Sequence, residues 1–331
     1  MTERHAIAWA HGMASVQAMG GMLGPVTFLL PDGRQVSPLH VAPWFDDPDR
    51  ISQPPILQEL RGEWPCVPFG ADGPRSLPES WSASGETFDG AGVPHGHSSN
   101  TEWVFTKTSA TSLTLTCDYP ETHPIRRLTR TIAADLKAPA LDITLAVEAR
   151  RPCRLPIGLH PTLRLPSTGT ARLEPPRFRE GRVFPLDVEP GLGLLQPGAS
   201  FEGLESVPGR DGGSLSLARL PLAENTEELV QLVGVSGGFR LHHPEGWAVT
   251  LDWDSDHFPS LLLWISNRGR AYAPWNGRHV GLGVEPVCAG FDLGPAISTA
   301  PNPISAGGTA TARAFDPEHP FTTRYRIGVT A

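Results

Sequence analysis

The feature that most constrains this chain is an alternation of apolar and polar residues with a period of two. In residues 141–149 (LDITLAVEA) the alternating apolar positions are Leu141, Ile143, Leu145 and Val147. Successive side chains of a strand point to opposite faces, so the pattern predicts strands with one buried face. Similar patterns recur at 112–118, 214–220 and 247–254, whereas 260–266 (SLLLWIS) is apolar on both faces and predicts a central strand covered twice.

Turn signals fit the same architecture. Residues 26–41 predict a hairpin that turns at Pro31-Asp32-Gly33, and 35 glycines and 35 prolines suit many short connections. The stretch 223–233 (AENTEELVQLV) predicts a short helix opening on an Asn or Thr cap. We therefore predict an all-β fold, a large antiparallel β-sandwich with few short helices. It forms a single domain over 25–331, with 1–24 as an N-terminal extension and 185–212 as a long insertion or rim loop.

Composition excludes several classes of protein. The net charge is −8, Lys is nearly absent and no Lys/Arg-rich run occurs, which argues against nucleic-acid binding. No apolar stretch approaches the length of a membrane span, and the N-terminus lacks the pattern of a signal peptide. Four scattered cysteines without a C-x-x-C motif favour a reduced, cytoplasmic protein.

Two ionisable residues stand in apolar surroundings. Glu285 interrupts the run GLGVEPVCAG (281–290), where an ionised carboxylate is costly to bury without a partner. Pro286 cannot donate a ladder hydrogen bond, so we expect the strand to end or bulge there. Glu285 is either paired with an arginine (Arg61, Arg164 and Arg278 are available) or an acid or base with an environment-tuned pKa. His160, before Pro161, is either a satisfied core histidine or a strand-end imidazole facing a cleft.

A third segment, PHGHSSNTEW (94–103), allows a metal hypothesis. His95, His97 and Glu102 give H-x-H-x4-E, the ligand spacing of cupins, although no later histidine completes that set and the segment resembles a loop. No Gly-rich phosphate loop is present. Near the three segments lie tryptophans that suit either core packing or contact with the apolar face of a sugar: Trp64, Trp103, Trp253, Trp264 and Trp275.

The chain resembles the aldose 1-epimerase (galactose mutarotase-like) family. The resemblance rests on LHPTLRLP around His160, GLGVEPVCAGFD around Glu285, PHGHSSNTEW, RGEWPCVPFG (61–70) and VTFLLPDGRQVSPL. These motifs follow the family's order and extend from about residue 25 to 330. The early segment departs from the family's usual arginine context, and the stretch FPSLLLWISNRGRAYAPWNGRH departs from the better-known sugar epimerases.

The resemblance implies a β-supersandwich with a sugar cleft across one curved sheet. It implies His160 as catalytic acid and Glu285 as catalytic base, with His95 and Arg61 binding the sugar. Trp64 and Asn276 are further candidate sugar contacts. We expect an aldose 1-epimerase without cofactor or metal, a monomer or homodimer acting on a small-molecule sugar. Three alternatives remain: a non-catalytic carbohydrate-binding protein on this fold, a metal enzyme using His95, His97 and Glu102, and a glycoside hydrolase in which Asp252, Asp254 or Asp256 partners Glu285.

Overall fold

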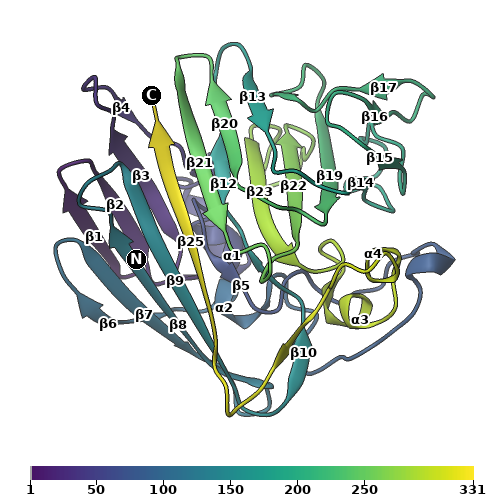
Figure 1. The fold of residues 1–331 in the computed structure, drawn as a ribbon, viewed down its shortest axis with the longest axis horizontal. Coiled ribbons are helices and arrows are strands. Elements are labelled where there is room, and N and C mark those ends of the chain that lie inside the picture. Colours follow the sequence, from purple (N-terminus) through teal and green to yellow (C-terminus); the bar gives the residue numbers. More distant parts are fainter. Residues whose placement is uncertain (1) are drawn as a thin grey trace.

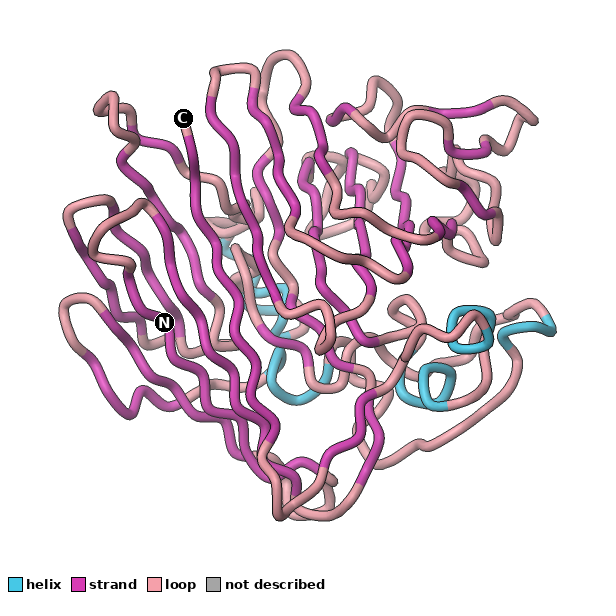
Figure 2. Tube along the Cα trace, viewed as in Figure 1, coloured by secondary structure: helices cyan, strands magenta, loops and turns pink. Residues whose placement is uncertain are grey.

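The computed structural model describes residues 2–331 and has the predicted all-β architecture (Figures 1 and 2). Two large antiparallel sheets dominate it. The larger has the order β18 (Arg219–Leu220), β13 (Ala171–Glu174), β20 (Phe239–His243), β21 (Trp247–Trp253), β25 (Phe321–Thr330), β9 (Ala140–Ala149), β8 (Ile125–Ala134), β7 (Ser112–Asp118) and β6 (Val104–Thr108). The second has the order β15 (Ser200–Phe201), β14 (Glu180–Val183), β19 (Thr226–Val233), β22 (Ser260–Asn267), β23 (Val280–Cys288), β11 (Ile157–Leu159) and β5 (Pro65–Cys66), and β12 (Thr162–Arg164) also pairs with β23.

The N-terminal residues build a separate sheet against these two. Its strands, in order, are β1 (Arg4–Trp9), β2 (Gly12–Gln17), β3 (Leu23–Leu29) and β4 (Gln35–Val36). The pairing of Phe28 with Val36 confirms the predicted hairpin. Ile7 and Val16 are buried in the main core, so the packing shows no boundary at residue 24. Two further pairs are short: β10 (Cys153–Leu155) with β24 (Arg313–Phe315), and β16 (Val207–Pro208) with β17 (Ser214–Leu215).

The main core lies between the two large sheets. Leu141, Ile143, Leu145 and Val147 of β9 point into it, as their alternation predicts, and Leu263 and Ile265 of β22 join them from the other sheet. The opposite face of β22, with Leu262 and Trp264, belongs to a second buried cluster. β22 is therefore covered on both faces, which confirms the prediction made from its continuous apolar run.

The second cluster covers the outer face of the β19–β22–β23 sheet. Residues between 42 and 81 and between 289 and 304 pack there, including Trp44, Ile56 and Phe291. These segments hold the helices, all short: η1 (Pro48–Ser52), α1 (Pro55–Gln58), η2 (Glu79–Trp81), α3 (Gly294–Thr299) and α4 (Pro303–Ala306); α2 (Gly96–Asn100) lies close to β5. Polar groups on this face of the sheet are thus enclosed by loops rather than by a second sheet.

Three sequence predictions were wrong. The predicted helix 223–233 is largely strand β19, which is buried throughout and pairs with β22 and β14. The segment 214–220 contributes only the two-residue strands β17 and β18. β23 neither ends nor bulges at Pro286, which keeps its register opposite Leu261. No helix within residues 2–331 has the length and apolar character needed to span a bilayer.

Candidate active site

Strand register brings His160 and Glu285 together. β11 and β12 both pair with β23, with Gly158 opposite Val287 and Thr162 opposite Gly283. These two pairings follow one register, so His160, between β11 and β12, lies opposite Glu285, where side chains on one face are direct neighbours. The separation between His160 Nε2 and Glu285 Oε1 is 3.4 Å. Two residues 125 positions apart in the sequence thereby form one polar pair.

The pair lies at the wall of a cavity of about 240 Å³ on the loop-covered face of the sheet. Its polar and charged lining residues are His95, His160, Arg270, Glu285 and Asp292. Three tryptophans and several aliphatic side chains complete the wall: Trp64, Trp264, Trp275, Pro54, Ile56, Leu57, Leu60, Pro94, Val188, Leu229 and Leu262. An enclosure that is mostly apolar with a few convergent polar groups is typical of a small-molecule site.

Burial controls the charge of the pair. Desolvation, and secondarily the nearby Asp292, raises the pKa of Glu285 well above its usual value. Desolvation, and secondarily His95, lowers the pKa of His160 well below its usual value. Glu285 Oε1 has no hydrogen-bond partner among residues 2–331. Both groups are therefore strongly perturbed and available to a ligand, as acid–base groups of an active site are.

The arginines that could have neutralised Glu285 are engaged elsewhere. Arg278 pairs with Asp47, and the guanidinium of Arg61 stacks over the Phe45 ring at 4.0 Å. Arg164 is exposed at the end of β12. The interpretation of Glu285 as half of a buried arginine ion pair therefore does not hold in this structure.

His95 lies beside His160, with ring centroids 4.9 Å apart in an edge-to-face arrangement. It adopts a left-handed backbone conformation (φ 55°) at the N-terminal end of α2, and the Gly70 amide donates to its Nδ1 at 3.4 Å. Burial lowers the pKa of His95 to about 4. His95 is thus a neutral imidazole near neutral pH that can exchange hydrogen bonds with a bound hydroxyl group.

Trp64 stacks on His160. The two rings are 4.1 Å apart and inclined by only 15°, and the His160 amide donates to the Trp64 carbonyl at 2.9 Å. The preceding residue, Glu63, is anchored in the main core by ion pairing with Arg130 and by the Tyr325 hydroxyl, which donates to Glu63 Oε1 at 2.7 Å. The segment that carries Trp64 is therefore held firmly, and Trp64 fixes the plane of the imidazole while lining the cavity.

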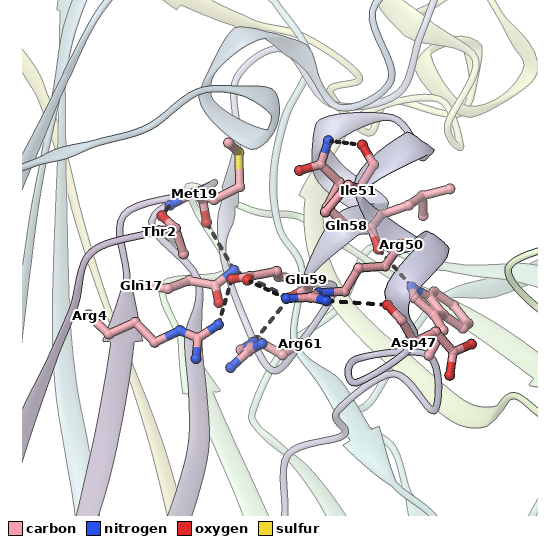
Figure 3. Close-up of polar contacts among 12 residues, drawn as sticks. Thr2, Arg4, Gln17, Met19, Asp47, Arg50, Ile51, Gln58, Glu59 and Arg61 are labelled. Atoms are coloured by element: carbon pink, nitrogen blue, oxygen red, sulfur yellow. Dashed lines mark hydrogen bonds and ion pairs between the residues drawn. The ribbon is translucent and has the colours of Figure 1, made fainter.

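Two predicted sugar contacts lie outside the cavity lining. Figure 3 shows Arg61 in a cluster with Arg4, Arg50 and Glu59, where Arg61 Nε donates to the Glu59 carbonyl at 3.0 Å. Asn276 is exposed on a turn with φ 47°, next to Trp275, which does line the cavity. The structure thus brings together His160, Glu285, His95 and Trp64 but places Arg61 and Asn276 outside this group.

Two charged lining residues escaped the sequence analysis. Asp292 follows Glu285 by seven residues, in the GFD of the same motif, and accepts from Arg75 at 3.0 Å. Arg270 stacks over Trp275 and Trp264, with Cζ 4.5 and 5.5 Å from the ring centroids. The segment RGRAYAPWNG could have signalled Arg270 only through its mixture of arginine and aromatic residues, which is a weak signal.

The residues of the alternative hypotheses do not converge. His97 bonds the Asp118 carbonyl and Glu102 accepts from Thr2, whereas His95 faces the cavity. Within residues 2–331 no group of three or more His, Cys, Asp or Glu side chains is arranged to hold a metal. Asp252, Asp254 and Asp256 lie on or after β21 of the other sheet and do not line the cavity. Of the five candidate tryptophans, Trp103 and Trp253 are also absent from its lining.

Comparison with known proteins supports the fold. No protein-family model and no curated protein sequence matches the chain. Among solved structures, a GalM/aldose epimerase homologue from C. elegans aligns over 100% of this chain and 99% of its own, with a TM-score of 0.65 and 14% identity. A galactose mutarotase-like protein from Lactobacillus casei aligns over 99% and 100%, with a TM-score of 0.61 and 15% identity. Likeness at this level of identity establishes a galactose mutarotase-like fold for the whole chain.

Proposed function

We propose that this protein is an aldose 1-epimerase that interconverts the α and β anomers of a hexose or related sugar. The observation that carries the proposal is the His160–Glu285 pair, buried at the wall of a small cavity with its imidazole and carboxyl groups 3.4 Å apart. The tryptophan-lined wall suits the apolar face of a sugar ring, and His95 adds a neutral hydrogen-bonding group. The names of the fold neighbours support the same activity.

The reaction needs two proton transfers on one sugar. Glu285 accepts the proton of the anomeric hydroxyl while His160 donates a proton to the ring oxygen, so the bond between C1 and the ring oxygen breaks. Rotation about C1–C2 presents the other carbonyl face, and the reverse transfers close the ring and restore both side chains. Each well-placed acid or base contributes typically about 10²- to 10⁴-fold in rate.

The two side chains exchange one proton during this cycle. Within the protein alone, the raised pKa of Glu285 and the lowered pKa of His160 place that proton on the carboxyl group. Sugar hydroxyls that donate to the carboxylate stabilise its ionised form, which lowers its pKa. Binding of a sugar would therefore move the proton to His160 and prepare both groups for ring opening. The pair should titrate as a unit, with macroscopic pKa values that belong to neither residue alone.

Magnetisation exchange between the anomeric protons of glucose and of galactose, measured by NMR with and without protein, tests the proposal. We expect exchange well above the buffer rate for at least one sugar, and a loss of about 10²-fold or more in His160→Gln. His243→Gln is the matched control, because His243 is also a buried histidine stacked on a tryptophan, Trp247, at 3.8 Å. Sugar binding without any accelerated exchange would instead favour a carbohydrate-binding protein.

A further inference from the structure

A guanidinium group with free N–H donors lies in the wall of the cavity. Arg270 lines the cavity, and its side chain is 17% exposed. Within residues 2–331 it makes one hydrogen bond, from Nε to Glu189 Oε1 at 2.7 Å. The terminal nitrogens keep their N–H groups free in an enclosure that is mostly apolar. Polar groups in such a place are ordinarily matched by acceptors, so the missing acceptors point to a ligand.

The orientation of the Arg270 guanidinium is fixed by its neighbours. Glu189, which accepts from Nε, is itself held by the Tyr272 hydroxyl, which donates to Glu189 Oε1 at 2.8 Å. The guanidinium also lies over the rings of Trp275 and Trp264, with Cζ 4.5 and 5.5 Å from the ring centroids. A charged anchor on Nε and two aromatic rings thus preorganise the group and leave its terminal nitrogens to another partner.

Trp264 links Arg270 to the acid–base pair. The His160 ring contacts the same indole edge to face, at 6.0 Å between centroids. Trp264 Nε1 donates to Glu227 Oε2 at 3.2 Å, which fixes the indole in the cavity wall. In the proposed reaction Glu285 and His160 engage the anomeric hydroxyl and the ring oxygen of the sugar. The hydroxyl groups left for Arg270 are then those on C2, C3, C4 and C6.

Arg61, the arginine that the family resemblance assigns to the sugar, is not placed for this contact. It is anchored in a similar manner, because its Nε donates to the Glu59 carbonyl and its guanidinium lies over the Phe45 ring. It is only 2% exposed, however, and it is absent from the cavity lining. Arg270 is the one arginine or lysine among residues 2–331 that lines the cavity.

We propose that Arg270 is the sugar-binding arginine of this cavity, and that its terminal nitrogens donate to one or more of the C2, C3, C4 and C6 hydroxyl oxygens. The inference rests on the proposed function, because it assigns a sugar contact in the same site. It makes Arg270 a specificity-determining residue on the loop between β22 and β23. A sugar that lacks the contacted hydroxyl binds weakly, because it leaves a donor of the site unpaired.

Isothermal calorimetry with D-galactose, D-glucose and their 2-, 3-, 4- and 6-deoxy derivatives tests this contact without requiring turnover. For the wild type we expect the removal of at least one hydroxyl to weaken binding about tenfold or more, as for a hydrogen bond to a charged group. In Arg270→Met, which keeps an unbranched side chain against the tryptophans, the same removal should change affinity by less than about twofold.

Arg278→Met is the matched control. Arg278 lies in the same loop, pairs with Asp47 and is not part of the cavity lining, so this variant should keep the wild-type pattern. Arg270→Lys gives a second measurement should the methionine variant not fold. Lysine keeps the charge beside Glu189 but lacks the planar pair of donors, so we expect the loss on deoxygenation to fall below about threefold.

Each outcome decides the inference separately from the epimerase activity. No binding of either parent sugar, no deoxy sugar that binds about tenfold more weakly, or the same loss on deoxygenation in wild type and both Arg270 variants would overturn it. Dependence of one hydroxyl contact on Arg270 without anomer exchange would uphold the contact and contradict the epimerase. Anomer exchange without any such dependence would uphold the epimerase and contradict the contact.

Discussion

Glu63 and Glu285 are both buried glutamates, yet the protein treats them in opposite ways. Glu63 lies in the main core, where it pairs with Arg130 and accepts from Tyr325. Glu285 lies across one strand pairing from His160 and has no cation beside it; its Oε1 lacks a hydrogen-bond partner within residues 2–331. Burial raises the pKa of both groups, but only Glu63 has an arginine that counteracts the shift. One carboxylate anchors structure, and the other is left free for a ligand.

The two sites are also mechanically connected. Glu63 precedes Trp64, and Trp64 stacks on His160, the partner of Glu285. A satisfied ion pair in the core therefore fixes the position of the unsatisfied pair at the cavity. Precise placement of catalytic groups by a rigid supporting shell is a general requirement of active sites. Three variants should separate the roles of the two carboxylates.

Arg130→Met should make Glu63 resemble Glu285 by removing its cation. Breaking a buried ion pair from one side leaves an uncompensated buried charge, and we expect a loss of about 3–5 kcal/mol in the free energy of unfolding. Denaturant unfolding measures this. Arg127→Met, on the same strand but with an exposed partner in Asp118, should cost less than about 1 kcal/mol. Equal losses of unfolding free energy in the two variants would contradict the view that the buried Arg130 pair anchors the fold and the exposed Arg127 pair does not.

Trp64→Leu should break the connection between the two sites. Without the stacked indole, the plane of the His160 imidazole is no longer fixed. The protonated imidazole also loses its attraction to the face of the indole ring. We therefore expect a loss of about 10- to 100-fold in turnover. The pKa of His160 should fall further, so activity should be lost at a lower pH on the alkaline side. Trp64→Phe should restore most of the rate. A pH–rate profile that shifts equally in Trp247→Leu, which removes the stack on His243, would contradict a specific role.

Glu285→Gln should stabilise the fold at alkaline pH. The folded-state pKa of Glu285 is raised, so the folded protein holds this proton more tightly than the unfolded chain, and stability falls as pH rises above the unfolded value near 4.5. Glutamine does not ionise, so the variant does not lose this stability as the pH rises. We expect a gain of about 1–3 kcal/mol at pH 8 that vanishes near pH 4.5, measured by denaturant unfolding at both pH values. A variant less stable than wild type at pH 8 would show that Glu285 is, like Glu63, a structural anchor.

The fold could be predicted where the physical signal was local. The alternation in β7, β9 and β21 shows directly because one face of the nine-stranded sheet is solvated. The segment of β19 was predicted as a short helix from a possible Asn or Thr cap, and it carries two glutamates, Glu227 and Glu228, that are polar for a buried strand. Their partners come from distant segments: Ser266 and Trp264 for Glu227, and the Leu194 amide for Glu228. Hydrogen bonds supplied by distant segments cannot be detected in a window of ten residues of sequence.

The residues of the candidate site also fall into two groups, those with a local signal in the sequence and those without one. His160 and Glu285 stood out because each is a titratable group within an apolar run, and the structure places them on opposite strands of one register. Arg61 was predicted from a motif, but its guanidinium turns towards Glu59 and Phe45. Arg270, which lines the cavity, pairs with Glu189 across two loops whose course no periodicity determines.

The most direct test of Glu285 as the base is the rate of anomer exchange in Glu285→Gln compared with wild type, followed by NMR on the sugar that the wild type turns over. Glu228→Gln serves as control, because Glu228 is a buried carboxylate on β19 that does not line the cavity. We expect Glu285→Gln to lose at least about 10²-fold in exchange rate and still bind the sugar, while Glu228→Gln keeps its rate. Exchange at the wild-type rate in a folded Glu285→Gln protein would contradict the assignment of Glu285 as the base.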